Sequence, residues 1–473
     1  MKLRQESADH AAGTEMLTVV PKLRRELVEE NNHLINKVRE EDRVVHDWYR
    51  FVLAFPPHLI RHYLQKLGAD PDRDVVLDPF VGCGTTSVEA KKLGFEGYAT
   101  EANPVGCLAT KVKTTWDLKP ARLTAFLESI LRDAKRGYKR SGFDDEDLFF
   151  QCDAEEEERD ETLILTGLTT EQEQLIPEGF ISPVPLAKFL ILLKAIDHVV
   201  PELSNPDVPS ARYRDLFRLA AGAVLVEGIG NLGFGPEVYR TAPKKDAPVV
   251  VLFERKVRKM IEDLVFVRQQ HPVNPFTCVQ TSDAREMEGI PDNTIDVVIT
   301  SPPYPNEKDY TRSTRLESVL LHLIKDKTAL RGTKELLVRS NTRTIFKGDD
   351  DDKHIQHISS IIRVADQIEK KRQELQKTSG FERLYHKVVR LYFGGMYRHL
   401  AALKRKLRSG ARCAYVVGDQ MSFFQIPIRT GQLLAEVADD LGFQVTDIDL
   451  WRERRSTTTR LSLREEVLIL RKP

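Results

Sequence analysis

The sequence predicts an α/β fold in which an open sheet carries a ligand site at the carboxyl ends of its strands. Three segments support this prediction. Residues 75–94 have the pattern of a strand, a glycine-rich turn and a helix; residues 97–101 form a second strand that ends in an acid; residues 294–304 form a buried strand stopped by two prolines. Each segment is a weak signal by itself, and their combination carries the prediction.

The first element is a short apolar strand, residues 75–77, which runs into the turn D-P-F-V-G-C-G-T-T at 78–86 and a helical stretch at 87–94. Gly82 and Gly84 permit tight backbone geometry and close approach of a ligand. The helix that follows offers free N–H groups in its first turn. Glycine turns are common in α/β proteins, so a purely structural turn is the alternative.

The second element, residues 97–101, ends in Glu101. In nucleotide-binding α/β folds, an acid at the end of the second strand binds ribose hydroxyls. A lone acid at a strand end is usually only solvated, but this one follows the glycine-rich turn at the expected distance. We therefore expect Glu101 to bind a ribose.

The third element is the apolar, β-branched strand 294–299, followed by the run S-P-P-Y at 301–304. Neither proline can donate to a strand ladder and both fix φ, so the strand ends abruptly. Its tip then presents a serine hydroxyl, rigid carbonyl groups and an aromatic ring where open α/β sheets bind ligands. A plain strand-terminating turn is the alternative for this run taken alone.

The two motifs together resemble those of S-adenosylmethionine-dependent DNA amino-methyltransferases. Residues 78–86 resemble the family's cofactor motif D-P-F-x-G-x-G-T-T, and residues 301–304 resemble its catalytic S-P-P-Y. The resemblance extends to the helix before the cofactor motif, to the strand whose acid meets the adenine, and to two later core strands. The matching residues are 56–60, 281–284, 415–419 and 464–470.

This resemblance implies a Rossmann-like methyltransferase fold, with a mostly parallel seven-stranded sheet and helical insertions. It implies that S-adenosyl-L-methionine is the cofactor and is bound by Asp78, Phe80, Gly82, Gly84, Thr85, Glu101 and Asp283. The catalytic residues that it implies are Ser301, Pro302, Pro303 and Tyr304. No metal ion is expected.

The chemistry of amino methylation explains these residue types. An exocyclic amine of a base is a poor nucleophile, because its lone pair is conjugated with the ring. Hydrogen bonds from the amine to the Ser301 hydroxyl and the Pro302 carbonyl would turn the nitrogen towards tetrahedral geometry and stabilise its developing positive charge. Tyr304 would stack on the base, which must leave the DNA helix to reach the pocket. No covalent nucleophile is required, and the sequence has no Pro-Cys dipeptide for C5-cytosine chemistry.

We expect methyl transfer to N4 of cytosine in DNA, because family members that act on adenine N6 more often carry Asp or Asn in place of the motif's serine. Adenine N6 is the first alternative. An RNA amino-methyltransferase and a DNA-binding subunit with an inactive site are two others. The expected setting is a restriction-modification or related defence system, with a cognate restriction endonuclease as a further candidate partner.

Composition agrees with a globular protein that is neither exported nor inserted in a membrane. The 473 residues suggest about three domain-sized units, and they include no long apolar run and no signal-peptide core. The five cysteines are scattered without zinc-ligand spacing, which favours reduced thiols in the cytoplasm. Because the net charge is +0, binding of double-stranded DNA needs a local basic surface.

Shifts in composition divide the chain into six segments. They are an N-terminal helical arm (1–45), the cofactor-binding half of the core (46–115), a first helical insert (116–275), the catalytic strands (276–325), a second helical insert (326–390) and the C-terminal part of the core (391–473). Within the first insert we expect an acidic boundary at 144–161, helices at 186–200 and 213–226, and a loop at 228–236.

Either insert could read the DNA sequence, because the core is committed to the cofactor and the base. We expect the first insert to do so, since its glycine loop is followed by Arg240, Lys244 and Lys245, which suit a groove or phosphate contact. Arg312, after the catalytic motif, is a further candidate for a phosphate contact. A surface loop beside a solvated basic helix is the alternative for the first group, and a salt-bridged helix start is the alternative for Arg312.

Overall fold

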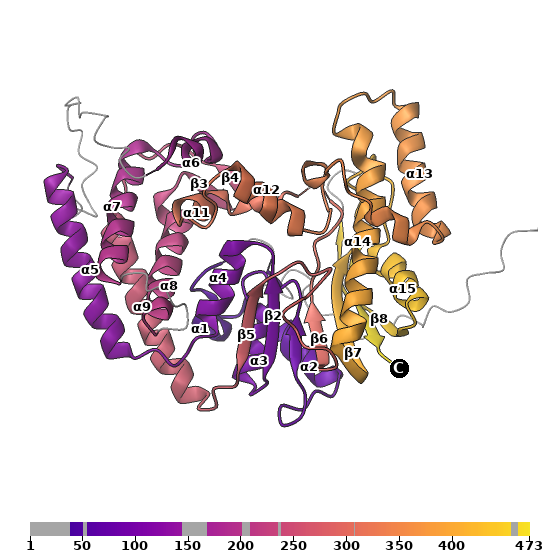
Figure 1. Ribbon diagram of the computed structural model, residues 1–473, viewed down its shortest axis with the longest axis horizontal. Helices are drawn as coiled ribbons and strands as arrows, with labels where there is room; N and C mark the ends of the chain where they lie inside the picture. Colours follow the sequence, from indigo (N-terminus) through magenta and orange to yellow (C-terminus); the bar gives the residue numbers. More distant parts are fainter. Residues whose placement is uncertain are drawn as a thin grey trace, which may run out of the picture.

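The computed structural model describes residues 38–50, 54–143, 168–200, 209–234, 238–306, 308–455 and 462–473. A seven-stranded sheet lies at the centre, between a body of helices on one side and a smaller helical lobe on the other (Figure 1). Its strands are β1 (Val76–Asp78), β2 (Gly97–Glu101), β5 (Thr277–Thr281), β6 (Ile295–Thr300), β7 (Leu407–Gly418), β8 (Gln444–Arg455) and β9 (Ser462–Arg471).

The order of the strands across the sheet is β5-β2-β1-β6-β7-β9-β8. Neighbouring strands from β5 to β7 pair in parallel, whereas β9 runs antiparallel to both β7 and β8. The strand of the glycine-rich turn, β1, therefore lies directly between β2, which carries Glu101, and the catalytic strand β6. The predicted Rossmann-like fold with a mostly parallel seven-stranded sheet is confirmed.

Helices cover both faces of this sheet. On one face Val76 and Val297 pack against α2 and α3, and on the other Leu77 and Val298 pack in the core that contains α14 and α15. These helices are α2 (Pro57–Lys66), α3 (Thr85–Lys92), α14 (Tyr385–Lys406) and α15 (Thr430–Asp440). Successive residues of a strand point to opposite faces, so short, continuously apolar strands suit a sheet that is buried on both sides.

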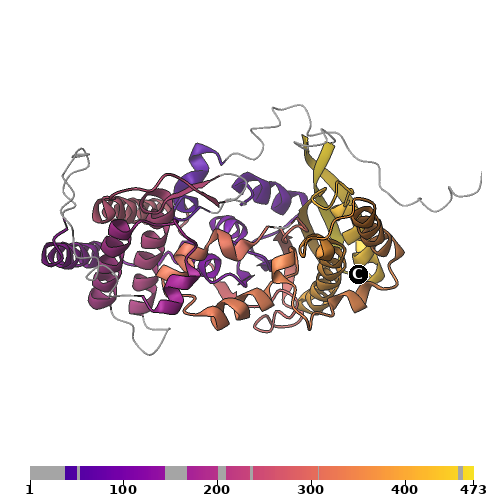
Figure 2. The same cartoon turned by 90° about the horizontal axis from the view of Figure 1, so that it is seen from above.

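The first insert forms a helical body beside the sheet (Figures 1 and 2). Its long helices are α5 (Pro120–Arg140), α7 (Pro183–Val199), α8 (Pro209–Val224) and α9 (Val249–Gln270), and α4 (Pro104–Lys113) packs between them and the sheet. In α5 the buried residues Leu123, Leu127, Ile130 and Ala134 recur every three or four positions, which places them on one face. Both helices predicted in this insert are present, as α7 and α8.

The second insert crosses from the helical body to the lobe that contains α14. α12 (Lys327–Leu336) lies between the two in both views (Figures 1 and 2). The chain continues through the 3-10 turns η4 (Thr342–Thr344) and η5 (Asp351–Ile355) to α13 (Ser359–Glu374), which packs on α14. The remaining short elements are η1 (Glu40–Asp42), α1 (Arg43–His46), α6 (Thr170–Leu175), α10 (Tyr310–Ser313), α11 (Arg315–Leu320) and η6 (Glu382–Leu384).

The segment 228–236 differs from its prediction as a loop. A π-helical turn, η3 (Leu225–Ile229), runs into β3 (Leu232–Phe234), which pairs with β4 (Val238–Arg240). Gly233 admits the ring of its cross-strand partner Tyr239, because a Cβ there would lie 2.6 Å from that ring. Packing between β3 and β4 therefore explains Gly233, which in the sequence only suggests a break in regular secondary structure.

Two other predictions concern segments that the structure describes in part or not at all. Of the predicted N-terminal arm, residues 38–45 are described, and they form η1 and part of the irregular turn α1. The rest of the arm and the predicted acidic boundary at 144–161 lie outside the described residues.

Within the described ranges, no helix is long and apolar enough to cross a membrane. The same residues contain no group of three or more His, Cys, Asp or Glu side chains placed to hold a metal ion. Their cysteines are free thiols, namely Cys83, Cys107, Cys278 and Cys413.

Candidate active site

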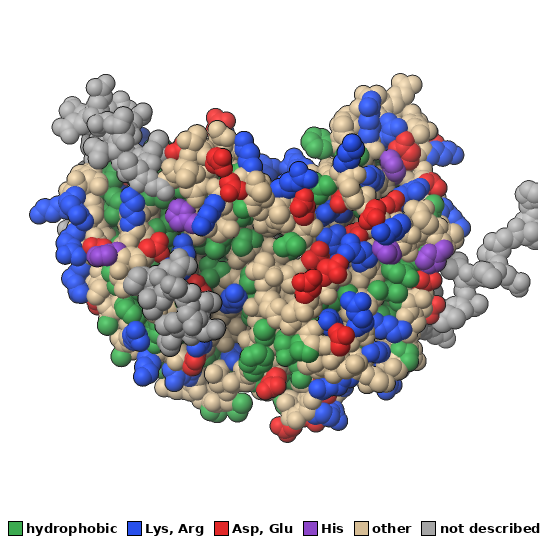
Figure 3. Space-filling model, in the orientation of Figure 1, with side chains coloured by type: hydrophobic (Ala, Val, Ile, Leu, Met, Phe, Trp, Pro, Cys, Tyr) green, Lys and Arg blue, Asp and Glu red, His purple; other side chains and the backbone are tan. Residues whose placement is uncertain are grey.

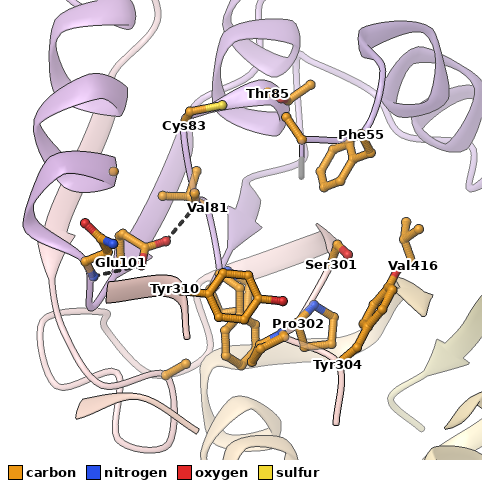
Figure 4. A pocket seen from close by; sticks show the side chains of 18 of the residues that line it. Phe55, Val81, Cys83, Thr85, Glu101, Ser301, Pro302, Tyr304, Tyr310 and Val416 are labelled. Atoms are coloured by element: carbon orange, nitrogen blue, oxygen red, sulfur yellow. Dashed lines mark hydrogen bonds between the residues drawn. The ribbon is translucent and has the colours of Figure 1, made fainter. Parts of the chain in front are cut away.

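A cavity of about 420 Å³ opens at the carboxyl ends of β1, β2 and β6 (Figure 4). The glycine-rich turn, the acid of β2 and the S-P-P-Y segment all reach it. The predicted site residues in its wall are Phe80, Gly82, Thr85 and Glu101 from the first half of the core, and Ser301, Pro302, Pro303 and Tyr304 from the second. The structure thus brings together segments that are far apart in the sequence.

Positive backbone angles shape the glycine-rich turn. Gly82 and Gly84 have φ angles of 54° and 93°, in the region that favours glycine. Gly84 is also the N-cap of α3, and a Cβ on it would lie 3.0 Å from the Thr110 hydroxyl oxygen. A Cβ on Gly82 would meet no atom within 4 Å. Since Gly82 lines the cavity, the turn offers bare backbone to a ligand.

Glu101, at the end of β2, turns its carboxylate towards this turn. Its Oε2 accepts a hydrogen bond from the Gly82 amide at 2.7 Å, and its Oε1 accepts one from the Asn103 amide at 2.8 Å (Figure 4). Burial raises the pKa of Glu101 to about 7, although the two amide donors favour the ionised form. A carboxylate has further acceptor positions, so Glu101 can still bind hydroxyl groups in the cavity.

Asp78 and Gly84, also predicted to bind the cofactor, are absent from the cavity wall. Asp78 lies behind the turn, where its Oδ1 accepts hydrogen bonds from the Thr300 hydroxyl at 2.6 Å and from the Phe80 amide at 3.1 Å. Burial raises the pKa of Asp78 to about 6. These bonds join the end of β1 to the end of β6, so the structure places Asp78 as a support of the turn.

The S-P-P-Y segment leaves β6 with its serine and tyrosine close together. The Ser301 and Tyr304 side chains both line the cavity, and both lie near Val416 (Figure 4). The Tyr304 ring packs on Gly418 of β7, where a Cβ would lie 3.0 Å from the ring carbon Cε2. Burial and the nearby Glu465 carboxylate hold the pKa of Tyr304 well above its usual range. Two neighbouring strands therefore fix this ring in the cavity wall.

Tyr310 is a site residue that the sequence analysis did not select. Its ring lies in the cavity beside Pro302 (Figure 4). Burial raises the pKa of Tyr310 to about 12. The only signal in the sequence is an aromatic residue soon after the S-P-P-Y run, and nothing there shows that the loop folds back on itself.

Three further parts of the cavity wall come from segments outside the cofactor and catalytic motifs. Tyr49 and Phe55 precede α2, Trp451 and Arg454 lie on β8, and Leu336–Val338 follow the body of α12. The last of these walls belongs to the second insert. The cavity is therefore completed by an element outside the segments that resemble the methyltransferase core.

Asp283, the predicted adenine contact, is absent from the cavity wall, although its neighbours Ser282 and Ala284 belong to it. Arg285 holds the Asp283 carboxylate: its Nη2 lies 2.7 Å from Oδ2, and its Nε lies 3.0 Å from both oxygens. The backbone amide of Arg285 also donates to Oδ1 at 2.8 Å. The carboxylate thus faces an arginine rather than the cavity.

The predicted DNA contacts differ in their freedom to bind a phosphate. The exposed ones are Arg240, Lys245 and Arg312. Lys244 is half-buried, and its Nζ donates to the carbonyls of Gly228 at 2.7 Å and Gly230 at 2.6 Å. The geometry therefore gives Lys244 a structural role at the end of η3, and its role as a phosphate contact stays a prediction.

Two basic side chains of α9 are paired with carboxylates of neighbouring elements. Lys256 pairs with Glu227 at 2.8 Å, and Arg258 pairs with Glu128 at 2.7 Å. A different basic region is visible in Figure 3, where Lys and Arg side chains lie along a notch in the upper edge, between the helical body and the lobe of α13 and α14. α12 lies at this notch (Figure 1).

This chain is similar to known DNA methylases. A family model described as DNA methylase, of the N6/N4 type, matches residues 27–111. The Type II methyltransferase M.BsoBI of Geobacillus stearothermophilus is 24% identical over 471 residues, which cover 94% of this chain and 88% of that protein. M.MvaI of Kocuria varians, also a Type II methyltransferase, is 24% identical over 350 residues, 68% of each chain. M.MjaII of Methanocaldococcus jannaschii, of the same description, is 30% identical over 111 residues, 23% of this chain and 20% of that protein.

Proposed function

We propose that this chain, a DNA amino-methyltransferase of the N4/N6 type, transfers a methyl group from S-adenosylmethionine to N4 of cytosine in double-stranded DNA. The observation that carries the proposal is the position of the S-P-P-Y segment: Ser301 and Tyr304 share one cavity with Gly82 and Glu101. A base bound by the first pair and a methyl donor bound by the second would meet inside this cavity. Positioning is the main task in a displacement between two bound reactants.

One half of the cavity fits the cofactor. The Glu101 carboxylate can accept hydrogen bonds from ribose hydroxyls, Gly82 leaves its backbone open, and Phe80 provides apolar surface beside them. When bound, S-adenosylmethionine would supply a methyl group that is attached to a positively charged sulfur. After the transfer, the sulfur would remain in the leaving group as a neutral thioether. A volume of about 420 Å³ is in the range of small-molecule sites.

The other half fits a base that has left the DNA helix. Its amine would donate hydrogen bonds to the Ser301 hydroxyl oxygen and to the Pro302 carbonyl, which the second proline holds rigid. Both acceptors would stabilise positive charge on the amine nitrogen as the methyl group arrives, and the nitrogen would then release one proton to water. The rings of Tyr304 and Tyr310 line the same cavity, on either side of Pro302 in Figure 4, and offer aromatic surface for stacking.

Cytosine N4 is proposed over adenine N6 because the motif begins with Ser301, a hydroxyl-bearing residue, where adenine-specific members of the family more often have Asp or Asn. Adenine N6 is the second candidate, since the same two acceptors would also bind its amine. An inactive DNA-binding subunit is a weaker candidate, because the catalytic and cofactor segments are both intact and share one cavity. Methylation of an RNA amine is also weaker, because the sequence offers no recognisable RNA-binding module.

We infer a Type II restriction-modification setting in the cytoplasm, since the relatives M.BsoBI and M.MvaI are Type II methyltransferases. Duplex DNA would approach the cavity from the basic notch at α12. A cognate restriction endonuclease recognising the same sequence is the partner that this setting implies.

Transfer of a labelled methyl group tests this function. The protein, S-adenosylmethionine with a tritiated methyl group, and unmethylated genomic DNA are incubated, and label in the DNA is counted. We expect label in the DNA and none in an equal mass of RNA. Ser301→Ala should reduce the rate, and the matched control Ser379→Ala, at an exposed position outside the cavity wall, should not. Absence of label in DNA with the unaltered protein would refute the proposal.

A further inference from the structure

A buried arginine beside the cavity connects the loop after β5 with the second insert. Arg285 is 7% exposed and holds the Asp283 carboxylate with one side of its guanidinium. Nη1 donates to Oδ2 of Asp351 at 2.8 Å, and Nη2, which also bonds Asp283, donates to the Glu335 carbonyl at 2.6 Å. All three nitrogens of this side chain are therefore engaged, and two of them reach into the second insert.

A second arginine clamps the same stretch of chain. Arg339 is 4% exposed and donates through Nη1 to the carbonyls of Lys334 at 2.9 Å and Glu335 at 3.3 Å. Its Nε and Nη2 each lie 2.9 Å from an oxygen of Asp349. The end of α12 is thus fixed by two arginines that are themselves neutralised by carboxylates.

The clamped stretch is the part of the second insert that enters the cavity. Leu336, Leu337 and Val338 line it, directly after the Glu335 carbonyl that Arg285 holds. Phe80 and Ala284 also line the cavity, and His399 holds both of them in place. The His399 Nδ1 atom is 2.7 Å from the Ala284 carbonyl, and the His399 ring packs edge-on to the ring of Phe80. Apolar side chains held in this way suit a planar ligand such as adenine.

We propose that Asp283 and Arg285 are positioning residues, which hold Leu336–Val338 as one wall of the adenine site instead of contacting the adenine themselves. The identity of the ligand as S-adenosylmethionine rests on the proposed function. A buried ion pair fixes geometry in this way, because loss of one partner leaves the other charge buried without compensation. The second insert thereby takes a direct part in cofactor binding.

The two arginines also connect the cofactor site with α12, which lies at the basic notch (Figures 1 and 3). None of the side chains of α12 is fully buried, so packing of its own side chains holds it only weakly, and its ends determine its position. Asp326 caps its start by accepting a hydrogen bond from the Ala329 amide at 2.7 Å, and the two arginines hold its end. Adenine packed against Leu336–Val338 would stabilise the same helix that lies at the basic notch.

Calorimetric titration of the full chain with S-adenosylmethionine tests this, and it needs no DNA. Arg285→Lys keeps the charge but loses the planar fork that reaches Asp283, Asp351 and a carbonyl at once. We expect Arg285→Lys and Asp283→Asn each to weaken binding about tenfold, the size of one lost hydrogen bond to a charged group. The double variant should bind no more weakly than either single variant, because both act through one clamp.

Two further variants separate this effect from damage to the fold. Leu337→Ala leaves the ion pairs intact and should still weaken binding, because it removes part of the wall itself. Arg412→Lys is the matched control: Arg412 also joins one carboxylate, Asp74, to backbone carbonyls, but outside the cavity. Arg412→Lys should leave cofactor affinity unchanged.

Trypsin gives a second readout that does not depend on activity. Arg285→Lys should speed cleavage within residues 331–347 in the free protein, and S-adenosylmethionine should protect this stretch less than in the unaltered chain.

Two calorimetric results would overturn the proposal. Additive losses of affinity in the double variant would show that Asp283 contacts the ligand itself, and unchanged affinity in Arg285→Lys would show that the clamp does not matter. Failure of the unaltered protein to bind S-adenosylmethionine would instead refute the proposed function.

Discussion

The backbone amide of Gly82 lies 2.7 Å from Oε2 of Glu101, so the turn after β1 and the end of β2 form one unit at the cavity. β1 and β2 are neighbouring parallel strands, which brings the two residues together. Because the same carboxylate is proposed to bind ribose hydroxyls, the shape of the turn and the charge of the acid are coupled. A change in either should therefore appear in cofactor binding.

Cofactor affinity is expected to rise with pH around neutrality. The pKa of Glu101 is raised to about 7, and the ionised carboxylate is the form that accepts hydrogen bonds from both ribose hydroxyls. Below pH 7 Glu101 gains a proton and binding weakens; above pH 7 the affinity reaches a plateau. Calorimetry with S-adenosylmethionine across this range measures the effect, and an affinity that falls as the pH rises would contradict the role of Glu101.

Glu101→Gln is the control for this pH dependence, since its affinity for S-adenosylmethionine should be lower and nearly constant with pH.

The stability of the folded protein should change with pH in the opposite sense to the cofactor affinity. The folded-state pKa of about 7 exceeds the ordinary value of 4.5, so stability falls as the pH rises from 4.5 to 7, because only the unfolded state ionises freely there. The full cost remains above pH 7 and is absent below pH 4.5. Glu101→Gln should therefore raise the Tm near pH 8 and leave it almost unchanged near pH 4.

Close approach of α4 to the glycine-rich turn predicts a second effect. A Cβ on Gly106 would lie 2.7 Å from the carbonyl oxygen of Gly82, so Gly106→Ala must displace the turn. We expect S-adenosylmethionine affinity to fall by about tenfold or more, with retained secondary structure. Gly332→Ala is the matched control, because a Cβ there meets no atom within 4 Å. Equal affinities of the two variants in calorimetry would rule out the close approach as a determinant of binding.

The aromatic ring of Tyr304 is expected to matter more than its hydroxyl. Tyr304→Ala should lose a stacking contribution of about 1–3 kcal/mol and slow methyl transfer accordingly. Tyr304→Phe keeps the ring and should retain most of the rate. Single-turnover assays on duplex DNA compare the two variants, and a Tyr304→Ala protein as fast as the unaltered one would argue against a flipped base at this position.

Local signals in the sequence predicted an open sheet with a ligand site at its strand ends, and the family resemblance supplied the mostly parallel, seven-stranded arrangement of that sheet. Prolines 302 and 303 end β6, and the glycine-rich turn ends β1, through backbone constraints that act within a few residues. The adjacency of β1, β2 and β6 then follows from the ordinary topology of α/β sheets. For this reason Glu101 and Ser301 could be assigned to one site before their contacts were known.

Contacts with distant segments were not predictable in this way. Asp283 has the expected place after β5, but its carboxylate is held by Arg285, whose other partners lie in the second insert. Tyr310 reaches the cavity because its loop folds back on the S-P-P-Y segment. In both cases the role depends on long-range packing that leaves no periodic or motif-like signal in the chain.

Lys244 and Lys245 are adjacent in the sequence but should behave differently. Lys244→Met removes the donor to the carbonyls of Gly228 and Gly230 and should lower stability by about 1–3 kcal/mol. Lys245→Ala changes an exposed side chain and should leave the Tm unchanged, while reducing the salt dependence of DNA binding by about one unit of slope if Lys245 meets a phosphate. Thermal melts and anisotropy titrations measure these effects; a Tm that is insensitive to Lys244→Met would contradict its structural role.

The product of the reaction tests the central claim most directly. DNA is methylated by the purified protein with S-adenosylmethionine, digested to nucleosides and analysed by mass spectrometry against authentic standards. The proposed chemistry at Ser301 and Pro302 predicts N4-methylcytosine as the new nucleoside, at a level that Ser301→Ala lowers. N6-methyladenine as the only new nucleoside, or no modified nucleoside at all, would contradict it.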